Sequence, residues 1–366
     1  MKIAIVVPGG VDRSGEVKVV PALLALLERL SARHEVHVFA LRQEVQPGQW
    51  RLCGAQVHNI GGRSSTLGQL RAVLALLREH RRGRFDVVQS IWAGGAGLVA
   101  VMAARLLGRP CAVHVAGGEL VALGDIGYGG RLTWRGRLRE AWVLHGADAL
   151  TAASAPVLAQ LAALGHTGQR LPLGVDLARW PPMAPRQRVR GEPLRVVQLA
   201  SINRVKDPGC LLRALSVVPQ VQADFIGEDT LNGEMQALAA QLGVSERVRF
   251  HGFMTQRAAQ PLVARAHLCV VASRHEAGPL AALEAAVLGV PCIGTAVGHL
   301  AEWAPGAALV VAPGDVAGLA RLLVQLDGDE PLRLRLAEAA QRRALAEDAD
   351  FTHDRFAQLH AELAGW

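Results

Sequence analysis

The chain has 366 residues, which is longer than a single hydrophobic core usually supports, so two domains are expected. Hydrophobic residues make up 51% of the chain and charged residues 19%, which excludes a disordered chain and is typical of a globular α/β protein. The formal net charge is +7, but aromatic residues are only 4% and no zinc-finger spacing accompanies the charge, so nucleic acid is not the expected partner.

Strand-like apolar runs alternate with helical patterns from the first residues onward, which predicts parallel sheets with right-handed crossovers. In the first half we expect strands at residues 2–7, 35–40, 57–60, 86–90, 111–115 and 149–153, and helices at residues 17–32, 67–82 and 131–144. The opening strand is too short for a signal peptide, and the longest apolar run, residues 91–104, is shorter than a bilayer requires. No membrane-spanning segment is expected.

A proline-rich, basic stretch over residues 179–193 interrupts this pattern, which then restarts. In the second half we expect strands at residues 194–200, 221–227, 248–253, 268–273, 291–296 and 309–312, and helices at residues 330–346 and 351–364. The sequence therefore predicts two domains with a ligand cleft between them. The predicted parts are an N-terminal domain (1–178), a linker (179–193), a C-terminal domain (194–348) and a final helical segment (349–366).

Five cysteines, at positions 53, 111, 210, 269 and 292, form no Cys-x-x-Cys pair. Cys111, Cys269 and Cys292 lie in apolar, strand-like runs and are interpreted as small core residues. This usage is typical of a reducing compartment, so a cytoplasmic protein is expected.

The segment from Glu276 to Glu284 is the strongest functional signal. It joins an apolar strand to an apolar helix through Gly278 and Pro279, and a proline suits the first helical position. The free N–H groups at the start of such a helix, here at Gly278 and Leu280, attract a phosphate. A carboxylate beside a phosphate is costly unless it binds hydroxyl groups, so the two glutamates predict a phosphate-bearing sugar as the ligand.

A glycosidase is the alternative for Glu276 and Glu284. Its two carboxyl groups would lie about 5–5.5 Å apart for retention or about 6.5–9.5 Å apart for inversion. A helical rise of about 1.5 Å per residue separates these two by about 12 Å, which favours two binding carboxylates on one side of a ligand.

Arg204 and Lys206 follow the strand expected at residues 194–200, in a strand-to-helix loop of the kind that binds ligands in open α/β sheets. Cations there stabilise negative charge on a departing phosphate. Lys206 is the safer candidate because a point charge tolerates displacement better than a guanidinium fork. The alternative for both residues is a solvated loop charge.

These segments occur together with two others, Leu-Gly-Val-Asp at residues 173–176 and His-Val-Ala-Gly-Gly-Glu at residues 114–119. In their order along the chain, the four segments resemble the motifs of the retaining family-4 glycosyltransferases. Together they cover essentially the whole chain. The resemblance implies the GT-B fold, with two Rossmann-like domains whose parallel sheets face each other across a cleft and a last helix that crosses back to the N-terminal domain. It also implies transfer of a sugar from a nucleotide-sugar to an acceptor hydroxyl, in envelope glycan, glycolipid or exopolysaccharide synthesis.

The resemblance implies that Glu276 and Glu284 hold hydroxyl groups of the sugar and the ribose, that Lys206 and Arg204 bind the diphosphate, and that His114 faces the cleft at the reaction centre. The catalytic residues would be His114, Arg204, Lys206 and Glu276. The other residues that it places near substrates are Gly15, Gly252, Gly278, Pro279 and Leu280 on the donor side, and Gly9, Gly10 and Glu119 on the acceptor side.

No metal and no cofactor beyond the nucleotide-sugar co-substrate are expected. Cationic side chains and a helix N-terminus at the phosphates make a divalent ion unnecessary. The Asp-x-Asp sequences at residues 327–329 and 348–350 are interpreted as solvated charges. Ala277, Leu173 and His299 depart from the family's pattern, which leaves the identity of the sugar open.

Two other functions remain open on the sequence alone. One is a nucleotide-sugar epimerase of the same fold, which would convert the donor without an acceptor. The other is a non-catalytic nucleotide-sugar-binding module, which would bind the donor and never turn over.

The positive charge lies in the first half of the chain. Residues 1–180 carry 21 Lys and Arg against 12 Asp and Glu, a difference of +9, whereas residues 181–366 carry 18 against 20, a difference of −2. Residues 131–142 interleave arginines with Leu132, Trp134, Leu138 and Trp142, which predicts a helix with an apolar stripe beside basic residues. We expect it to dock on the inner face of the cell membrane, where a lipid-linked acceptor lies; the alternative is a helix whose tryptophans pack inward.

Overall fold

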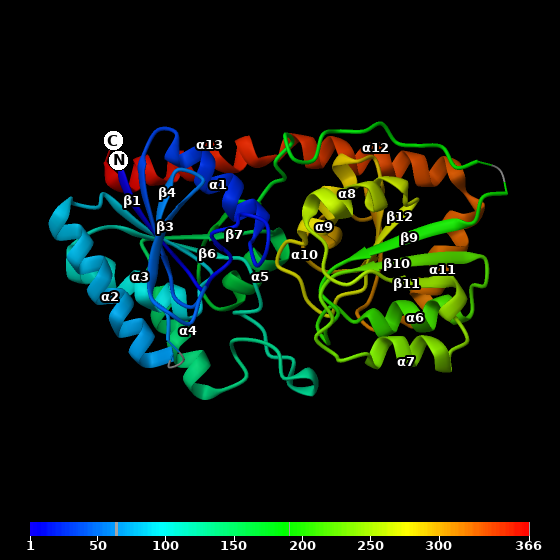
Figure 1. Ribbon diagram of the computed structural model, residues 1–366, viewed down its shortest axis with the longest axis horizontal. Helices are drawn as coiled ribbons and strands as arrows, with labels where there is room; N and C mark the ends of the chain where they lie inside the picture. Colours follow the sequence, from blue (N-terminus) through cyan, green and yellow to red (C-terminus); the bar gives the residue numbers. More distant parts are fainter. Residues whose placement is uncertain (63–64, 190, 366) are drawn as a thin grey trace. The chain divides into compact units, whose positions relative to one another are not determined.

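The computed structural model describes residues 1–62, 65–189 and 191–365, and the chain divides into two compact units (Figure 1). Unit 1 comprises Met1–Leu173 together with Ala349–Trp366, and unit 2 comprises Gly174–Asp348. The first boundary thus lies within the Leu-Gly-Val-Asp segment, and the proline-rich stretch after it belongs to unit 2.

Unit 1 is built on one eight-stranded sheet with the order β3-β4-β2-β1-β5-β6-β7-β8. The order reverses direction between β1 and β5, which makes the carboxyl ends of these two strands a topological switch point. The strands are β1 (Lys2–Val7), β2 (Glu35–Ala40), β3 (Gly48–Leu52), β4 (Ala55–Asn59), β5 (Val87–Ile91), β6 (Cys111–Val115), β7 (Ala149–Ala152) and β8 (Gln169–Arg170).

Helices cover both faces of this sheet. α2 (Ser65–Arg82), α3 (Gly95–Leu107) and α4 (Trp134–Gly146) pack in a row on one face, while α1 (Pro21–Ser31) packs against α13 (Ala349–Ala364) on the other (Figure 1). α5 (Ala155–Ala163) follows β7. Arg29 Nε lies 2.5 Å from Asp350 Oδ1, and Thr352 Oγ1 donates to the carbonyl of Pro172 at 2.9 Å. The end of the chain is therefore part of unit 1.

Two local features of unit 1 differ from the sequence-based prediction. β3 pairs with β4 in an antiparallel hairpin, so the sheet is not wholly parallel; its turn uses Cys53 and Gly54, both at positive φ, as a tight two-residue hairpin turn requires. The first helix begins at Pro21 and not at residue 17. A proline favours the first helical position and excludes the residue before it from helical geometry, so the preceding residues stay in the loop.

Unit 2 is a doubly wound, parallel six-stranded sheet with the order β11-β10-β9-β12-β13-β14. The order reverses between β9 and β12. The strands are β9 (Leu194–Leu199), β10 (Val221–Ile226), β11 (Val248–Phe250), β12 (Leu268–Val271), β13 (Cys292–Thr295) and β14 (Ala308–Val311). The cysteines interpreted as core residues are buried in these sheets, and all five are free thiols.

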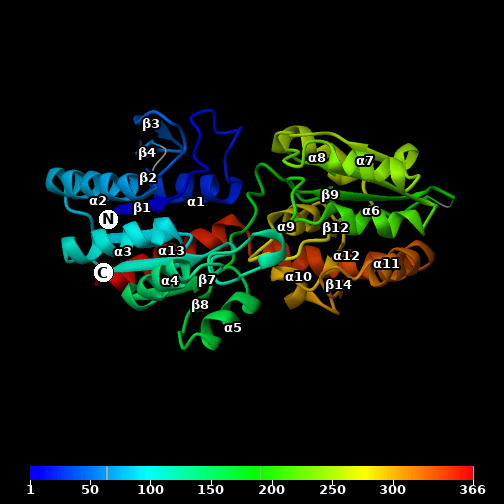
Figure 2. The ribbon, with the colours of Figure 1, turned by 90° about the horizontal axis from the view of Figure 1, so that it is seen from below.

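Two apolar layers enclose the sheet of unit 2. Helices α6 (Pro208–Ser216), α7 (Glu234–Gln241) and α11 (Val316–Gly328) form one layer. Helices α8 (Gln256–Arg265), α9 (Leu280–Val287), α10 (Gly298–Trp303) and α12 (Glu330–Ala346) form the other (Figures 1 and 2). Helices cover most of both faces, so the strand ends are the main positions where polar groups can meet a ligand.

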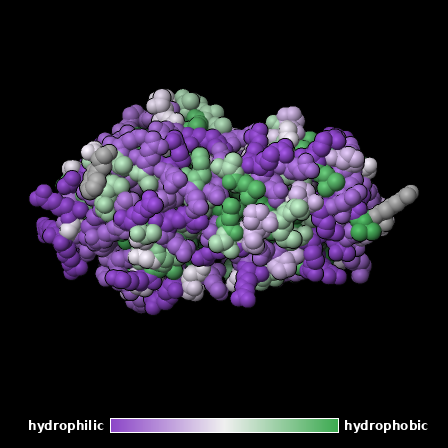
Figure 3. Space-filling model, turned by 90° about the horizontal axis from the view of Figure 1, so that it is seen from above, coloured by the Kyte–Doolittle hydropathy of each residue, from purple (hydrophilic) through white to green (hydrophobic). Residues whose placement is uncertain are grey.

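Within the described part of the chain, no helix combines the length and the apolar character needed to cross a membrane. Hydrophilic residues predominate on the face drawn in Figure 3, and hydrophobic residues form separate groups between them.

The sequence predicted that the aspartates of the two Asp-x-Asp sequences are solvated charges, but three of them have partners in the structure. Asp327 Oδ1 lies 2.5 Å from Arg188 Nη1, and Asp329 accepts a hydrogen bond of 2.9 Å from Leu332 N as the N-cap of α12. Asp350 pairs with Arg29. Arginines distant in sequence and the start of α12 therefore explain three of these four aspartates.

Candidate functional site

The two loops that leave the carboxyl ends of β9 and β12 meet at the switch point of unit 2. The backbone N–H of Arg274 donates to the carbonyl of Val205 at 2.7 Å and joins them. Lys206 Nζ lies 2.5 Å from Glu276 Oε1, which also accepts from Ser273 Oγ at 2.6 Å. These Lys and Glu side chains are 27% and 12% exposed. Two predicted residues 70 positions apart thus form one cation–carboxylate pair that solvent still reaches.

Lys206 is held in place by polar residues that the sequence did not reveal. Its backbone N–H donates to Asn203 Oδ1 at 2.9 Å, and its carbonyl accepts from the buried Gln198 at 3.1 Å. Asp207, at positive φ, caps α6 by accepting from Cys210 N at 3.2 Å. The loop is therefore fixed by side chains on both sides of the lysine. Their only sequence signal is polar residues beside a basic one.

Arg204 does not join this pair. Its guanidinium lies 3.3 Å from Glu234 at the start of α7, and both side chains are exposed. An exposed ion pair is worth about 0–1 kcal/mol, so Arg204 can leave Glu234 at little cost. The short Arg-Val-Lys spacing directs the two cations to different carboxylates.

The helix predicted after Glu276 is α9, with one difference at its start. Pro279 is the N-cap in extended geometry, and the helix begins at Leu280. The first N–H groups of α9, from Leu280 on, have no carbonyl four residues earlier within the helix. Gly298 packs on this turn so closely that a Cβ there would lie 2.7 Å from Pro279 Cδ. The helix start is therefore fixed from the side by the segment after β13.

Glu284 lies in the second turn of α9 and is buried, although it is a carboxyl group. Burial raises its pKa to about 7, and a hydrogen bond from Gln256 Nε2 to its Oε1, at 2.9 Å, opposes that rise. Gln256 belongs to the first turn of α8, and no sequence motif pointed to it. The hydrogen bond links α8 to α9.

Gly252 lies in the loop between β11 and α8. It has positive φ, and its carbonyl accepts a hydrogen bond from Gly227 N at 2.9 Å. The loop therefore packs against the end of β10, and Gly252 lies between β11 and the residue that contacts Glu284.

In unit 1 the glycine-rich loop after β1 is bonded to itself and to the segment after β2. Gln43 Oε1 accepts from Gly10 N at 2.7 Å and from Val11 N at 2.9 Å. Gly15 N donates to Asp12 O at 3.0 Å. Of the three glycines of this loop that were expected near substrates, Gly10 and Gly15 have their N–H groups engaged, while Gly9 follows β1 after Pro8.

His114, which the resemblance placed at the reaction centre, lies inside unit 1 and not at an open edge of that unit. Its side chain is fully buried on β6. Its Nδ1 lies 2.9 Å from Thr151 Oγ1, and its ring meets Phe356 of α13 edge-on at 5.5 Å. Burial lowers the pKa of His114 to about 3, so the imidazole is neutral. The reason is tertiary: the last helix, far away in sequence, covers this part of the sheet.

Glu119 ties two loops of unit 1 together. Burial raises its pKa, against hydrogen bonds from backbone N–H groups including those of Ala93 and Gly117. The bond from Ala93 N to Glu119 Oε1 measures 2.9 Å and joins the β5–α3 and β6–α4 loops. Trp92, which the sequence did not single out, has a φ of 77° beside this carboxylate. Such backbone strain in a bulky residue is concentrated at functional sites, and Trp92 directly follows β5 at the switch point of unit 1.

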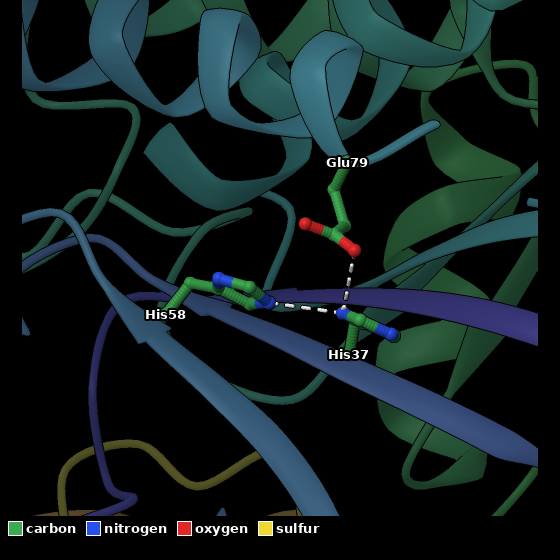
Figure 4. Close-up of side chains that lie close together, drawn as sticks. All are labelled: His37, His58 and Glu79. Atoms are coloured by element: carbon green, nitrogen blue, oxygen red, sulfur yellow. Dashed lines mark hydrogen bonds and ion pairs between the residues drawn. The ribbon is translucent and has the colours of Figure 1, made fainter. Parts of the chain in front are cut away.

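One cluster in unit 1 has the residue types of a metal site. His37 of β2 and His58 of β4 point toward each other, and Glu79 reaches them from α2 (Figure 4); the ligand atoms lie within 4.8 Å of one another. However, Lys2 Nζ lies 3.6 Å from Glu79 Oε1, and Arg82 lies 3.2 Å from Oε2. Two cations already neutralise this carboxylate, so we interpret the cluster as an ion-pair network that joins the sheet to α2.

Models of known protein families match the sequences of both units. A model described as glycosyl transferases group 1 matches residues 183–343, and a model of the glycosyl transferase 4-like domain matches residues 19–174. The two models between them span most of both units. The chain belongs to the group 1 glycosyl transferases.

Curated relatives of this family member include glycogen synthase of Mycobacterium tuberculosis, 31% identical over 220 residues that cover 58% of the chain and 53% of the relative. D-inositol 3-phosphate glycosyltransferase of Salinispora arenicola is 33% identical over 52% of the chain and 48% of the relative. The chain thus spans about half the length of these two relatives. The enzyme of the same name from Thermomonospora curvata is 29% identical over 92% of the chain and 89% of the relative.

Solved structures show the same fold at lower identity. Sucrose-phosphate synthase from Thermosynechococcus elongatus superposes with a TM-score of 0.84 at 18% identity and 99% coverage of both chains. Anabaena HepE in complex with UDP-glucose has a TM-score of 0.75 at 19% identity, with 99% and 100% coverage. Identities this low show the fold alone, and it is the predicted GT-B fold of two Rossmann-like domains.

Proposed function

We propose that this chain is a retaining glycosyltransferase that moves a sugar from a nucleotide-sugar to an acceptor hydroxyl. The observation that carries the proposal is the convergence of Lys206, Glu276 and the start of α9 at one switch point, with the buried Glu284 one turn further along. A cation and free N–H groups fit a diphosphate, and two carboxylates fit hydroxyl groups. The family membership and the fold support the same reading.

In this proposal the diphosphate binds between Lys206 and the start of α9. Lys206 either breaks its ion pair with Glu276 or keeps that pair while it also contacts the diphosphate. Arg204 joins by leaving its weak pair with Glu234. Glu276 then accepts from hydroxyls of the transferred sugar, and Glu284 from those of the ribose. The acceptor attacks from the face of the departing phosphate, whose oxygen takes the hydroxyl proton. Fixed cations and N–H dipoles stabilise the charge that develops on the leaving group.

A nucleotide-sugar panel tests this function. We expect a thermal-shift response to one or more nucleotide-sugars, and then release of nucleoside diphosphate that depends on an added glycan or lipid-linked acceptor, with the product anomer assigned by NMR. Conversion of the donor without any acceptor would indicate an epimerase, and binding without turnover would indicate a binding module. Absence of nucleoside diphosphate binding at millimolar concentration would refute all three.

Transfer is expected to be independent of a divalent metal. Lys206 and the α9 N–H groups supply the positive charge that a metal would otherwise provide. Activity should therefore be unchanged after exhaustive chelation, measured as the initial rate with and without chelator. Loss of activity that added Mg²⁺ or Mn²⁺ restores would contradict this prediction.

We also propose that the cytoplasmic enzyme docks on the inner face of the cell membrane through α4. Trp134 and Leu138 are each 63% exposed and Trp142 is 38% exposed, which supports docking over the alternative that the tryptophans pack inward. Spacings of four residues place them on one stripe, and Arg105 and Arg135 stack on the two indoles at 5.0 and 5.3 Å. Indoles beside arginines suit the interface of an anionic bilayer, where a lipid-linked acceptor is found.

Sedimentation with liposomes tests the docking surface. We expect binding to vesicles that contain anionic lipid and little binding to neutral ones, because each basic residue near an anionic surface contributes about 1 kcal/mol. Trp134→Ala with Leu138→Ala should abolish the binding, and added salt should weaken it. Arg321→Ala with Val324→Ala, a matched exposed pair on α11, should leave it unchanged. If wild-type protein stays in the supernatant at low salt, the docking proposal is refuted, whereas the proposed sugar transfer is not affected.

A further inference from the structure

A hollow of unit 2 lies against the part of the sheet formed by β9, β10 and β11. Its volume is about 220 Å³, and four of the residues that line it are arginines: Arg195, Arg247, Arg249 and Arg265. None of its lining residues belongs to the loops that carry Lys206 and Glu276. The hollow is therefore separate from the proposed diphosphate site.

The pairing of the strands explains why polar side chains gather there. Arg195 of β9 lies opposite Gln222 of β10, and Asp224 of β10 lies opposite Arg249 of β11. Alternate residues of a strand point to the same face of the sheet, and residues directly opposite each other on neighbouring strands also lie on one face. The side chains of these four residues therefore all lie on the same face of the sheet. The end of α8, with Arg265, forms a wall beside them.

The positive charges of this hollow have few acidic partners. The Arg247 guanidinium is fixed by backbone carbonyls, since it donates to Leu215 at 3.0 Å, Val218 at 3.1 Å and Val221 at 2.8 Å. Among the residues that the structure describes, neither Arg249 nor Arg265 has a carboxylate within ion-pair distance. Carbonyl oxygens orient a guanidinium without cancelling its charge, so this side of the hollow is a preorganised cationic surface.

The carboxylates near the hollow only partly balance its positive charge. Arg195 Nη2 lies 3.8 Å from Glu192 Oε1, a long contact, and its buried Nε has no hydrogen-bond partner. Of the two lining carboxylates, Asp224 is already engaged by His251 Nε2 at 2.6 Å, and Glu246 is exposed. Four arginines therefore face two carboxylates, and one arginine N–H still lacks an acceptor.

We propose that this hollow binds a small phosphate-bearing molecule at a site distinct from the donor site. Planar guanidinium groups bind phosphate oxygens in pairs, and a concave cationic surface concentrates anions. A bound dianion also relieves the mutual repulsion of neighbouring arginines. Gln222 and the free oxygen of Asp224 lie on the same face and suit hydroxyl groups of the molecule that carries the phosphate. This inference is independent of the proposed transfer reaction.

Calorimetric titration at fixed ionic strength tests the site, with inorganic phosphate and a hexose 6-phosphate as probes. We expect saturable binding in the wild type and in Lys206→Ala, in which the proposed donor site is impaired. Arg249→Ala with Arg265→Ala should weaken it at least tenfold. Arg321→Ala with Arg335→Ala, two exposed arginines elsewhere in unit 2, should leave it unchanged.

The rise in melting temperature with added probe gives a second readout, because a ligand that binds only the folded state stabilises it. That rise should be lost in the Arg249/Arg265 variant, whose two side chains are exposed and make no hydrogen bond or ion pair with any residue that the structure describes. The proposal is overturned if no saturable binding occurs at millimolar probe, if Lys206→Ala removes it, or if the Arg249/Arg265 variant binds like the wild type.

Discussion

Replacing Lys206 by alanine should lower turnover by about 100- to 1000-fold while changing donor affinity much less. Negative charge on the leaving diphosphate peaks in the transition state, so a cation placed there contributes more to kcat than to binding. The measurement is kcat and KM for the nucleotide-sugar in the variant and the wild type. A change confined to KM would mean that Lys206 binds ground state and transition state equally.

Two further variants separate the role of Lys206 from that of its partner. Glu276→Gln keeps the shape of the side chain but releases Lys206 from a 2.5 Å ion pair, so it should bind nucleoside diphosphate at least as tightly as the wild type while transferring sugar more slowly. Arg204→Ala should have a smaller effect than Lys206→Ala, because Arg204 is exposed and paired elsewhere. Equal losses in the two cation variants would contradict this ranking.

Replacing Glu284 by alanine should weaken nucleotide binding about 10- to 150-fold. A hydrogen bond to a charged group contributes roughly 1.5–3 kcal/mol, and this carboxyl is buried, so water does not replace it. Calorimetric titration with nucleoside diphosphate measures the loss. Glu338→Ala, which removes an exposed glutamate of α12, should leave the affinity unchanged. Equal affinity in Glu284→Ala and the wild type would remove Glu284 from the site.

The same carboxyl should make nucleotide binding depend on pH. Its pKa is raised from 4.5 to about 7, so between these values the folded, ligand-free protein retains a proton that the unfolded chain has lost. This group therefore stabilises the fold less as pH rises through that window. Ribose hydroxyls need the carboxylate as acceptor, so affinity should rise toward pH 7 and level off above it. Binding near pH 6 should release a proton, which titrations in buffers of different ionisation enthalpy detect.

The fold was accessible from the sequence because its signals are local. The apolar runs that became β1, β2, β6 and β9 were predicted within a residue of their observed ends, and the restart after the proline-rich stretch revealed the second sheet. Short-range rules also explain the errors. A two-residue turn at Cys53 and Gly54 produced an extra antiparallel strand, and Pro21 shortened the first helix. The sequence contains both the Cys53-Gly54 turn and Pro21, but the prediction followed the longer apolar pattern around each of them.

The sequence by itself predicted that Lys206, Glu276 and Glu284 gather at one end of the second sheet, because parallel strands bring their carboxyl ends to one edge. Only the tertiary structure decided what each side chain contacts. It paired Lys206 with Glu276, sent Arg204 to Glu234 and buried His114 beneath the last helix. Partners, burial and pKa depend on residues far apart in the chain, and no local pattern encodes those distances.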